Sequence, residues 1–159
     1  GPRGAPRPGR GRPAGAARRY LEAWQAAPDS EAGKRALGGL RTLATLLDDL
    51  ATLEELASQE RDTALATSAT ERLQLVAGTY KDLLNGADYL KRFPTGRQAD
   101  AVATRQEAIA DQLYTEIVLY QSIGDSVKAL ERIDRILTHA PTSRAAARIR
   151  DEAVMDGAG

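Results

Sequence analysis

The chain has 159 residues, of which 42% are apolar and only 4% aromatic, and its 22 basic residues balance its 22 acidic ones. Most of the apolar residues are Ala and Leu, which favours closely packed helices and argues against a β-sandwich or barrel. The absence of cysteine excludes disulfides and thiolate metal sites. No apolar run approaches the roughly 18–20 residues that a membrane span needs. Met155 is the sole methionine, so we expect a processed product or a piece of a longer protein.

Residues 1–15 form a basic segment that contains only Gly, Pro, Arg and Ala. Such a segment buries too little to offset the entropy of ordering, so we expect a disordered tail. The tail is either a solvated linker or a contact for nucleic acid or an anionic membrane surface. No aromatic residue is interleaved for base stacking. The arginines that would make this contact are Arg3, Arg7, Arg10, Arg12, Arg18 and Arg19.

The first predicted helix spans Ala16 to Ala27 and places Tyr20 and Trp24 on one apolar stripe. Trp24 is interpreted as a packing anchor and not as a ligand platform. The Pro28-Asp29-Ser30 segment ends this helix and supplies an N-cap for the next.

A long second helix is predicted from Glu31 to about Ser58 or as far as Leu65, with a break near Gly38 as an alternative. Its leucines recur largely in steps of three, so the apolar stripe winds around the helix and needs neighbours on more than one side, or a docked partner. Four acids in this helix are interpreted as a solvated face and not as a catalytic or cation site. They are Asp48, Asp49, Glu54 and Glu55.

A turn is predicted at residues 67–70, followed by a third helix from Glu71 to Arg92. Its apolar residues follow a heptad pattern, which allows a homodimeric coiled coil. We favour packing within the chain, because Asn85-Gly86 interrupts the seam and neighbouring helices also need partners. The heptad positions are Leu73, Val76, Tyr80, Leu83, Ala87 and Leu90.

A fourth helix is predicted over Gln98–Ser122, joined to a fifth by a turn at Gly124 with Asp125 or Ser126 as N-cap. The fifth helix carries an apolar stripe and ends before Pro141. We expect an antiparallel hairpin. A last helix, from Thr142 to about Met155, caps the array or begins a further repeat, and residues 156–159 form a flexible end. The stripe of the fifth helix consists of Val127, Leu130, Ile133 and Leu137.

This hairpin resembles the second half of a tetratricopeptide repeat, with an aromatic residue, a turn glycine, a small alanine, a large apolar residue and a closing proline at the family's offsets. Larger residues stand at Ile117 and Ile136, where the family has small ones. The separations of Pro28, Pro94 and Pro141 lack the family's period of about 34 residues. The positions that carry the resemblance are Tyr120, Gly124, Asp125, Ala129, Ile133 and Pro141.

The segments Phe93–Val102 and Ala140–Ile149 are similar to the tetratricopeptide-like proteins of bacterial envelopes, such as outer-membrane assembly lipoproteins and Tol-Pal accessory proteins. Both segments have a proline, a small polar cap and an Ala-rich helix start. This resemblance implies a bacterial protein of the periplasm or cell envelope, in preference to the cytoplasm.

Reactive chemistry is not indicated. His139 is the lone histidine, and it has no second histidine or cysteine with which to hold a metal. The sequence contains no nucleophile elbow, phosphate loop or dinucleotide fingerprint. We therefore expect no enzyme, no metal site and no cofactor.

The expected architecture is all-α, with antiparallel helix pairs that form a tetratricopeptide-like α-solenoid or an elongated bundle in one domain over residues 16–155, clearest at 98–139. The expected function is protein interaction or scaffolding; the alternatives are self-assembly through the heptads or anion binding by the tail. The resemblance implies a groove for a protein or peptide lined by the fourth helix, although Tyr114 and Val118 are equally consistent with burial against the preceding helix. Its residues would be Asp111, Tyr114, Val118, Gln121 and Ser122.

Overall fold

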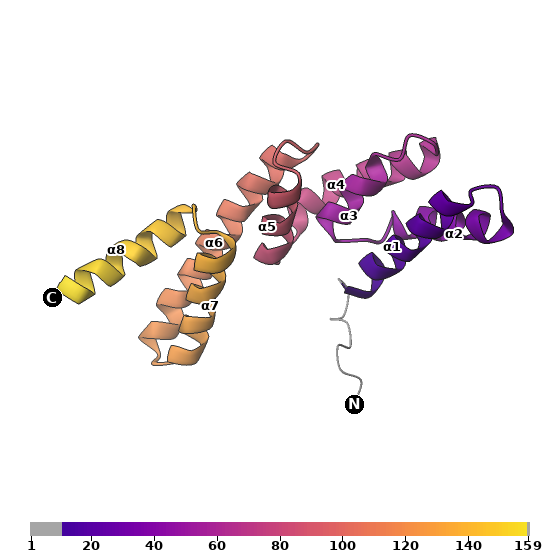
Figure 1. Ribbon diagram of the computed structural model, residues 1–159. Coiled ribbons are helices and arrows are strands. Elements are labelled where there is room, and N and C mark those ends of the chain that lie inside the picture. The colour runs from indigo at the N-terminus through magenta and orange to yellow at the C-terminus, as the bar shows by residue number, and fades with distance from the viewer. Residues whose placement is uncertain (1–10, 159) are drawn as a thin grey trace, which may run out of the picture. The chain divides into compact units, whose positions relative to one another are not determined.

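The computed structural model describes residues 11–158 and is entirely helical over that range, which confirms the all-α prediction (Figure 1). Contacts divide the chain into two compact units. The first runs to Gly78 and includes residues 96–98, and the second comprises residues 79–95 and everything from Ala99 onward. The helices are α1 (Gly11–Ala26), α2 (Glu31–Leu43), α3 (Leu50–Ala57), α4 (Thr63–Thr79), α5 (Leu83–Arg92), α6 (Ala99–Ser122), α7 (Ser126–His139) and α8 (Arg144–Ala158).

The predicted tail falls only partly within the described residues. Arg3, Arg7 and Arg10 lie outside them, as does the side chain of Arg12. Residues 11–15, assigned to the tail, instead form the first turn of α1. Ala17, Leu21 and Trp24 are buried on one face of this helix, so Trp24 is a packing residue, as predicted.

The first unit replaces the predicted long second helix with α2 and α3. The helix continues through Gly38 and ends at Leu43, so neither a continuous helix nor a break at Gly38 is correct. Asp49 begins α3 by accepting a hydrogen bond from the Thr52 amide (3.2 Å). The interruption lets a winding row of leucines point inward, because each segment can be oriented separately. Leu40, Leu47, Leu50, Leu53 and Leu56 are all at most 1% exposed.

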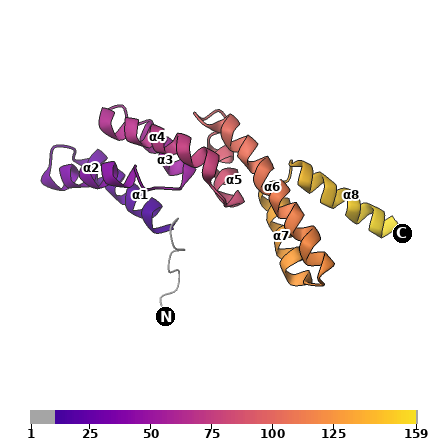
Figure 2. The ribbon, with the colours of Figure 1, turned by 180° about the vertical axis from the view of Figure 1, so that it is seen from behind.

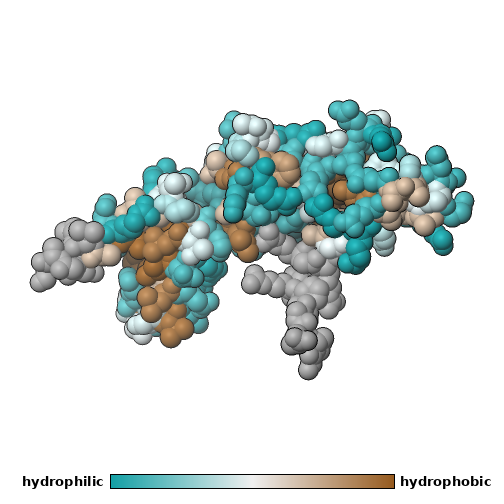
Figure 3. Space-filling view, viewed as in Figure 1, coloured by the Kyte–Doolittle hydropathy of each residue, from teal (hydrophilic) through white to brown (hydrophobic). Residues whose placement is uncertain are grey.

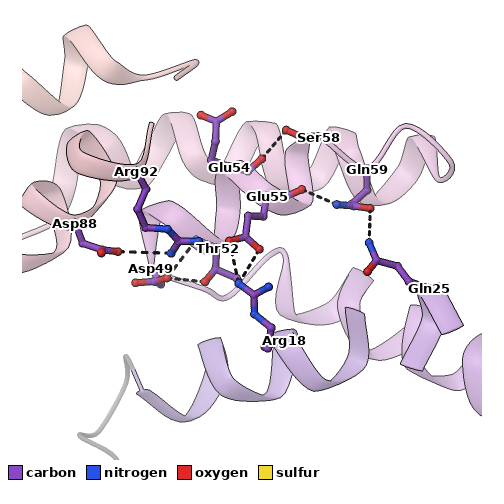
Figure 4. Close-up of polar contacts among 10 residues, drawn as sticks. All are labelled: Arg18, Gln25, Asp49, Thr52, Glu54, Glu55, Ser58, Gln59, Asp88 and Arg92. Atoms are coloured by element: carbon purple, nitrogen blue, oxygen red, sulfur yellow. Dashed lines mark hydrogen bonds and ion pairs between the residues drawn. The ribbon is translucent and has the colours of Figure 1, made fainter. Parts of the chain in front are cut away.

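Ion pairs and hydrogen bonds connect the elements of the first unit, and Figure 4 shows the contact between Arg18 and Glu55. Arg18 of α1 reaches both carboxylate oxygens of Glu55 at 2.9 and 2.8 Å. Arg97 donates to Glu54, which is 3% exposed. Arg72 donates to the carbonyl of Leu47 at 2.7 Å and pairs with Asp48. The interpretation of the four acids as a solvated face is therefore wrong for all but the exposed Asp48, because burial is compatible with charge when a cation or an amide is supplied.

The predicted third helix is also divided, because α4 ends at Thr79 and α5 begins after the N-cap Asp82. The turn predicted at residues 67–70 lies instead within α4. Tyr80, between the two helices, donates to Gln106 of α6 at 2.6 Å and lies 3.1 Å from the Val102 carbonyl. The heptad pattern predicted over one helix is thus divided between α4 and α5. Burial of the Tyr80 hydroxyl raises the pKa of Tyr80.

The second unit is built on the α6–α7 hairpin, and α5 and α8 both contact these two helices (Figure 2). The predicted fourth helix is confirmed to within one residue, since α6 is Ala99–Ser122. Gly124 takes the left-handed conformation (φ 79°), and Asp125 caps α7 through the Lys128 amide at 3.1 Å. These features confirm the predicted turn. The last helix starts two residues later than predicted, at Arg144.

Candidate partner-binding surface

The side chains of α6 that face α8 form a set of polar contacts. The Tyr114 hydroxyl donates to the Glu152 carboxylate, and the Arg148 guanidinium lies 4.8 Å from the centre of the Tyr114 ring. Arg144 donates to Asp111 at 3.0 Å from its side chain and to Glu107 at 3.1 Å from its backbone amide. Polar and cation–π contacts therefore hold α8 on this part of α6.

These contacts shift the pKa of two of the groups involved. The hydrogen bond to Glu152 raises the pKa of Tyr114, because the neutral hydroxyl is the donor and a tyrosinate would face a carboxylate. The hydrogen bond to Asp111 raises the pKa of Arg144. The α6–α8 contact is accordingly most favourable with a neutral Tyr114.

A groove of about 450 Å³ lies between α6 and α8. It is lined by Asp111, Tyr114, Thr115, Arg144, Ala145 and Arg148. Two of the five predicted partner-binding residues, Asp111 and Tyr114, therefore line one depression. Tyr114 contacts the last helix, α8, whereas the alternative expectation placed it against the helix that precedes α6.

Val118 continues the same face of α6, since it comes four residues after Tyr114 and seven after Asp111. It is 50% exposed. Gln121 and Ser122 are exposed near the end of α6, and the Ser122 hydroxyl donates to the Leu119 carbonyl at 2.6 Å. The structure thus separates the predicted set into two groove residues, one exposed apolar residue and two polar residues close to the turn.

The prediction that the apolar stripe of α7 packs inside the hairpin is wrong for the first two residues of the stripe, Val127 and Leu130. Val127 and Leu130 of α7 are 73% and 63% exposed, while Ala129 and Ile136 are the buried residues of this helix. The helix carries two apolar stripes, and the smaller alanine allows the close approach to α6. The spacing of Ala129 and Ile136, seven residues apart, was the signal for the buried stripe.

Val118, Val127 and Leu130 form one exposed apolar strip. In the antiparallel hairpin Arg132 bonds Glu116 at 2.8 Å, so Leu130 and Val118, each two residues closer to the turn, lie at one level. A step of two residues turns a helix by about 200°, which places both on the opposite side from that ion pair. Val127 precedes Leu130 by three residues, which is about one helical turn. Figure 3 shows apolar surface gathered along this hairpin beside α8.

The two arginines of the predicted anion-binding set whose side chains are described, Arg18 and Arg19, do not form a common site. Arg18 pairs with Glu55, and Arg19 is exposed on α1. Among the described residues no group of three potential metal ligands occurs. None of the described helices is long and apolar enough to cross a bilayer. Comparison of the chain with protein-family models, with curated proteins and with solved structures finds no match.

Proposed function

We propose that this chain is a protein-interaction or scaffolding module without catalytic activity, and that the apolar strip binds an amphipathic helix of a partner protein. Exposure of the three aliphatic side chains Val118, Val127 and Leu130 is the observation that carries the proposal. Full burial of one such side chain is worth about 1.5–3 kcal/mol, so a partner that covers the strip gains part of the free energy that association requires.

A helix is the favoured occupant because the same face already holds one. The polar contacts of α8 lie at Glu107, Asp111 and Tyr114, and the face continues from there to Val118. A second helix placed after α8 would extend an existing helix-on-helix interface. This arrangement matches the tetratricopeptide-like interpretation of α6 and α7, which forms part of the proposal, as does an envelope location.

The test uses a synthetic helical peptide with leucines at every third and fourth position and lysines elsewhere, compared with a scrambled peptide of the same composition. The full chain with Val118→Ser and Leu130→Ser should lose about tenfold or more in affinity for the ordered peptide, as expected for lost apolar burial. The matched control, Leu119→Ser with Ile123→Ser, removes exposed aliphatic side chains elsewhere on the hairpin and should bind normally.

Equal binding of the ordered and scrambled peptides, or equal loss in the two variants, would contradict the proposal. Self-assembly is the alternative occupancy, with a second copy of the chain on the strip. Light scattering over a concentration series separates the two. If the parent chain assembles and Val118→Ser with Leu130→Ser abolishes the assembly, the occupant of the strip is a second copy of the chain and not a partner helix.

A further inference from the structure

The opposite side of the α6–α7 hairpin holds a second cavity, of about 490 Å³. Four cationic side chains line it, with Glu116 as the acid among its lining residues, so the charge of the lining is three units positive. We call this cavity the basic pocket. The cations are Lys81, Arg105, Arg132 and Arg135.

Two of the cations are held in place by the protein. The Arg105 Nε donates to the Tyr80 carbonyl at 2.7 Å. Arg132 bonds Glu116 and lies 4.5 Å from the centre of the Tyr120 ring. Lys81 and Arg135 are exposed, and within the described part of the chain no ion pair joins either of them to an acid. The pocket therefore presents preorganised positive charge and two cations open to an anionic ligand.

The floor of the basic pocket is aliphatic, since Ala108, Ile109 and Leu113 contribute to its lining. Apolar surface also continues beyond it along α6. Leu119 follows Glu116 by three residues on the same face of α6. Ile123 lies in the turn directly after α6, where its amide still donates to the Leu119 carbonyl at 3.3 Å. These two side chains are 55% and 66% exposed. From Glu116, the last lining residue on α6, to Ile123 this face extends about 10 Å at about 1.5 Å per residue.

We infer that the basic pocket binds an acidic peptide segment of a partner, with carboxylates at the four cations and an adjacent aliphatic block on Leu119 and Ile123. Charge complementarity selects the acids, and the exposed aliphatic pair selects their apolar neighbours. A single-stranded nucleic acid is disfavoured because stacking of its bases would need a free aromatic face. Tyr120, the aromatic residue on this part of the hairpin, already has Arg132 and Lys128 at 4.5 and 5.3 Å from its ring centre.

The test measures fluorescence anisotropy of a labelled peptide in which an Asp/Glu block precedes a Leu/Ile block, titrated with the full chain. The variant Lys81→Glu with Arg135→Glu should reduce affinity about tenfold or more, with both structural arginines intact. The matched control, Lys34→Glu with Arg150→Glu, makes the same charge change at exposed positions that do not line the pocket and should bind like the parent chain. Circular dichroism checks that each variant keeps its helices.

Three further arms determine which chemistry is recognised. Replacement of the peptide acids by Asn and Gln should abolish binding. Leu119→Ser with Ile123→Ser should weaken binding of the two-block peptide but not of a peptide with the acidic block alone. Equal affinity of both charge variants, equal binding of the amide peptide, or tighter binding of a single-stranded RNA homopolymer would overturn the inference.

This inference is independent of the proposed function, because it concerns the other side of the hairpin. Val118→Ser with Leu130→Ser should leave acidic-peptide binding unchanged, and Lys81→Glu with Arg135→Glu should spare the lysine-rich amphipathic peptide. Failure of one proposal therefore does not imply failure of the other. Binding of both peptides through the same residues would contradict the assignment of two surfaces.

Discussion

The two compact units use aliphatic residues in different ways. In the first, most leucines of α2, α3 and α4 are buried, with Leu75 as an exposed exception, and arginine–carboxylate ion pairs join elements far apart in the sequence. In the second, the α6–α7 hairpin buries one stripe of each helix and leaves Val118, Leu119, Ile123, Val127 and Leu130 at 50% exposure or more. The first unit buries most of its leucines and leaves Leu46 and Leu75 exposed, whereas the second gathers its exposed aliphatic side chains on one hairpin that a partner can cover.

The difference follows from where the chain interrupts its helices. The turn between α2 and α3 lets each segment be oriented toward a shared core, so most of the winding leucine row is buried, although Leu46 is exposed. Two uninterrupted helices paired in a hairpin bury only the faces that meet, since each helix turns its remaining residues elsewhere. The second unit therefore combines a stable hairpin with unpartnered faces on both of its sides.

The largest test of this comparison pairs a buried leucine with an exposed one. Leu53→Ala in the first unit removes a side chain that is 0% exposed and should lower the free energy of unfolding by about 2–5 kcal/mol. Leu130→Ala should change it by less than about 0.5 kcal/mol, as surface substitutions usually do. Urea unfolding followed by circular dichroism measures both. A large loss in Leu130→Ala would show that the strip belongs to the core.

The second test asks whether the second unit is tightly packed where α5 meets α6. A Cβ at Gly86 would lie 2.1 Å from Gln106 Oε1 and 2.3 Å from Tyr80 Oη. Gly86→Ala should therefore cost about 1–3 kcal/mol of unfolding free energy through overpacking. The control Gly78→Ala has open space around the added methyl group and should be neutral or up to about 1 kcal/mol stabilising. Thermal unfolding measures the stability of both variants, and an equal loss of unfolding free energy in the two would contradict this packing.

The third test concerns the ion pair between Arg41 and Asp62 in the first unit. Asp62 pairs with Arg41 and also accepts from the Leu65 amide at the start of α4 (2.9 Å). Asp62→Ala should cost about 1 kcal/mol through loss of the cap, whereas Asp62→Asn keeps a capping group and should cost less.

The contribution of this ion pair to stability depends on pH with a defined sign. The hydrogen bond from Arg41 lowers the pKa of Asp62, so its contribution is present above the unfolded pKa of about 3.9 and is lost as pH falls through the lower folded value. Acid titration of stability should show a smaller decrease in Asp62→Asn than in the parent chain. Identical acid titrations would show that the ion pair contributes nothing.

The smallest expected effect is at the α6–α8 contact. The pKa of Tyr114 is raised, so its contribution is fully present below the unfolded pKa of about 10 and is lost as pH rises through the folded value. Tyr114→Phe should remove the part of the alkaline loss of stability that comes from ionisation of the hydroxyl. At neutral pH this substitution should lower the free energy of unfolding by a few tenths to about 1 kcal/mol. Ultraviolet titration and alkaline unfolding of the two chains provide the measurement, and an unperturbed Tyr114 titration would show that Glu152 is not its acceptor.

The sequence predicted the hairpin well because its signals are local. Gly124, Asp125 and Pro141 act within a turn or two of chain, and the α6 boundaries follow from such residues. Two of the five proposed site residues, Asp111 and Tyr114, do line one groove. The division of the second and third predicted helices was missed, since the residues that stabilise the breaks bind groups distant in sequence, as Tyr80 does with Gln106.

By itself the sequence determined the all-α class, the turn at Gly124 and the absence of any recognised reactive motif, because helix periodicity, capping and left-handed glycine act over a few neighbouring residues. Only the tertiary structure decided which of several apolar stripes is buried. Val127 and Leu130 have a spacing as helical as that of Ala129 and Ile136, and the difference lies in which face meets α6. Likewise, four cations from 81 to 135 share one pocket only because a loop and two helices place them together.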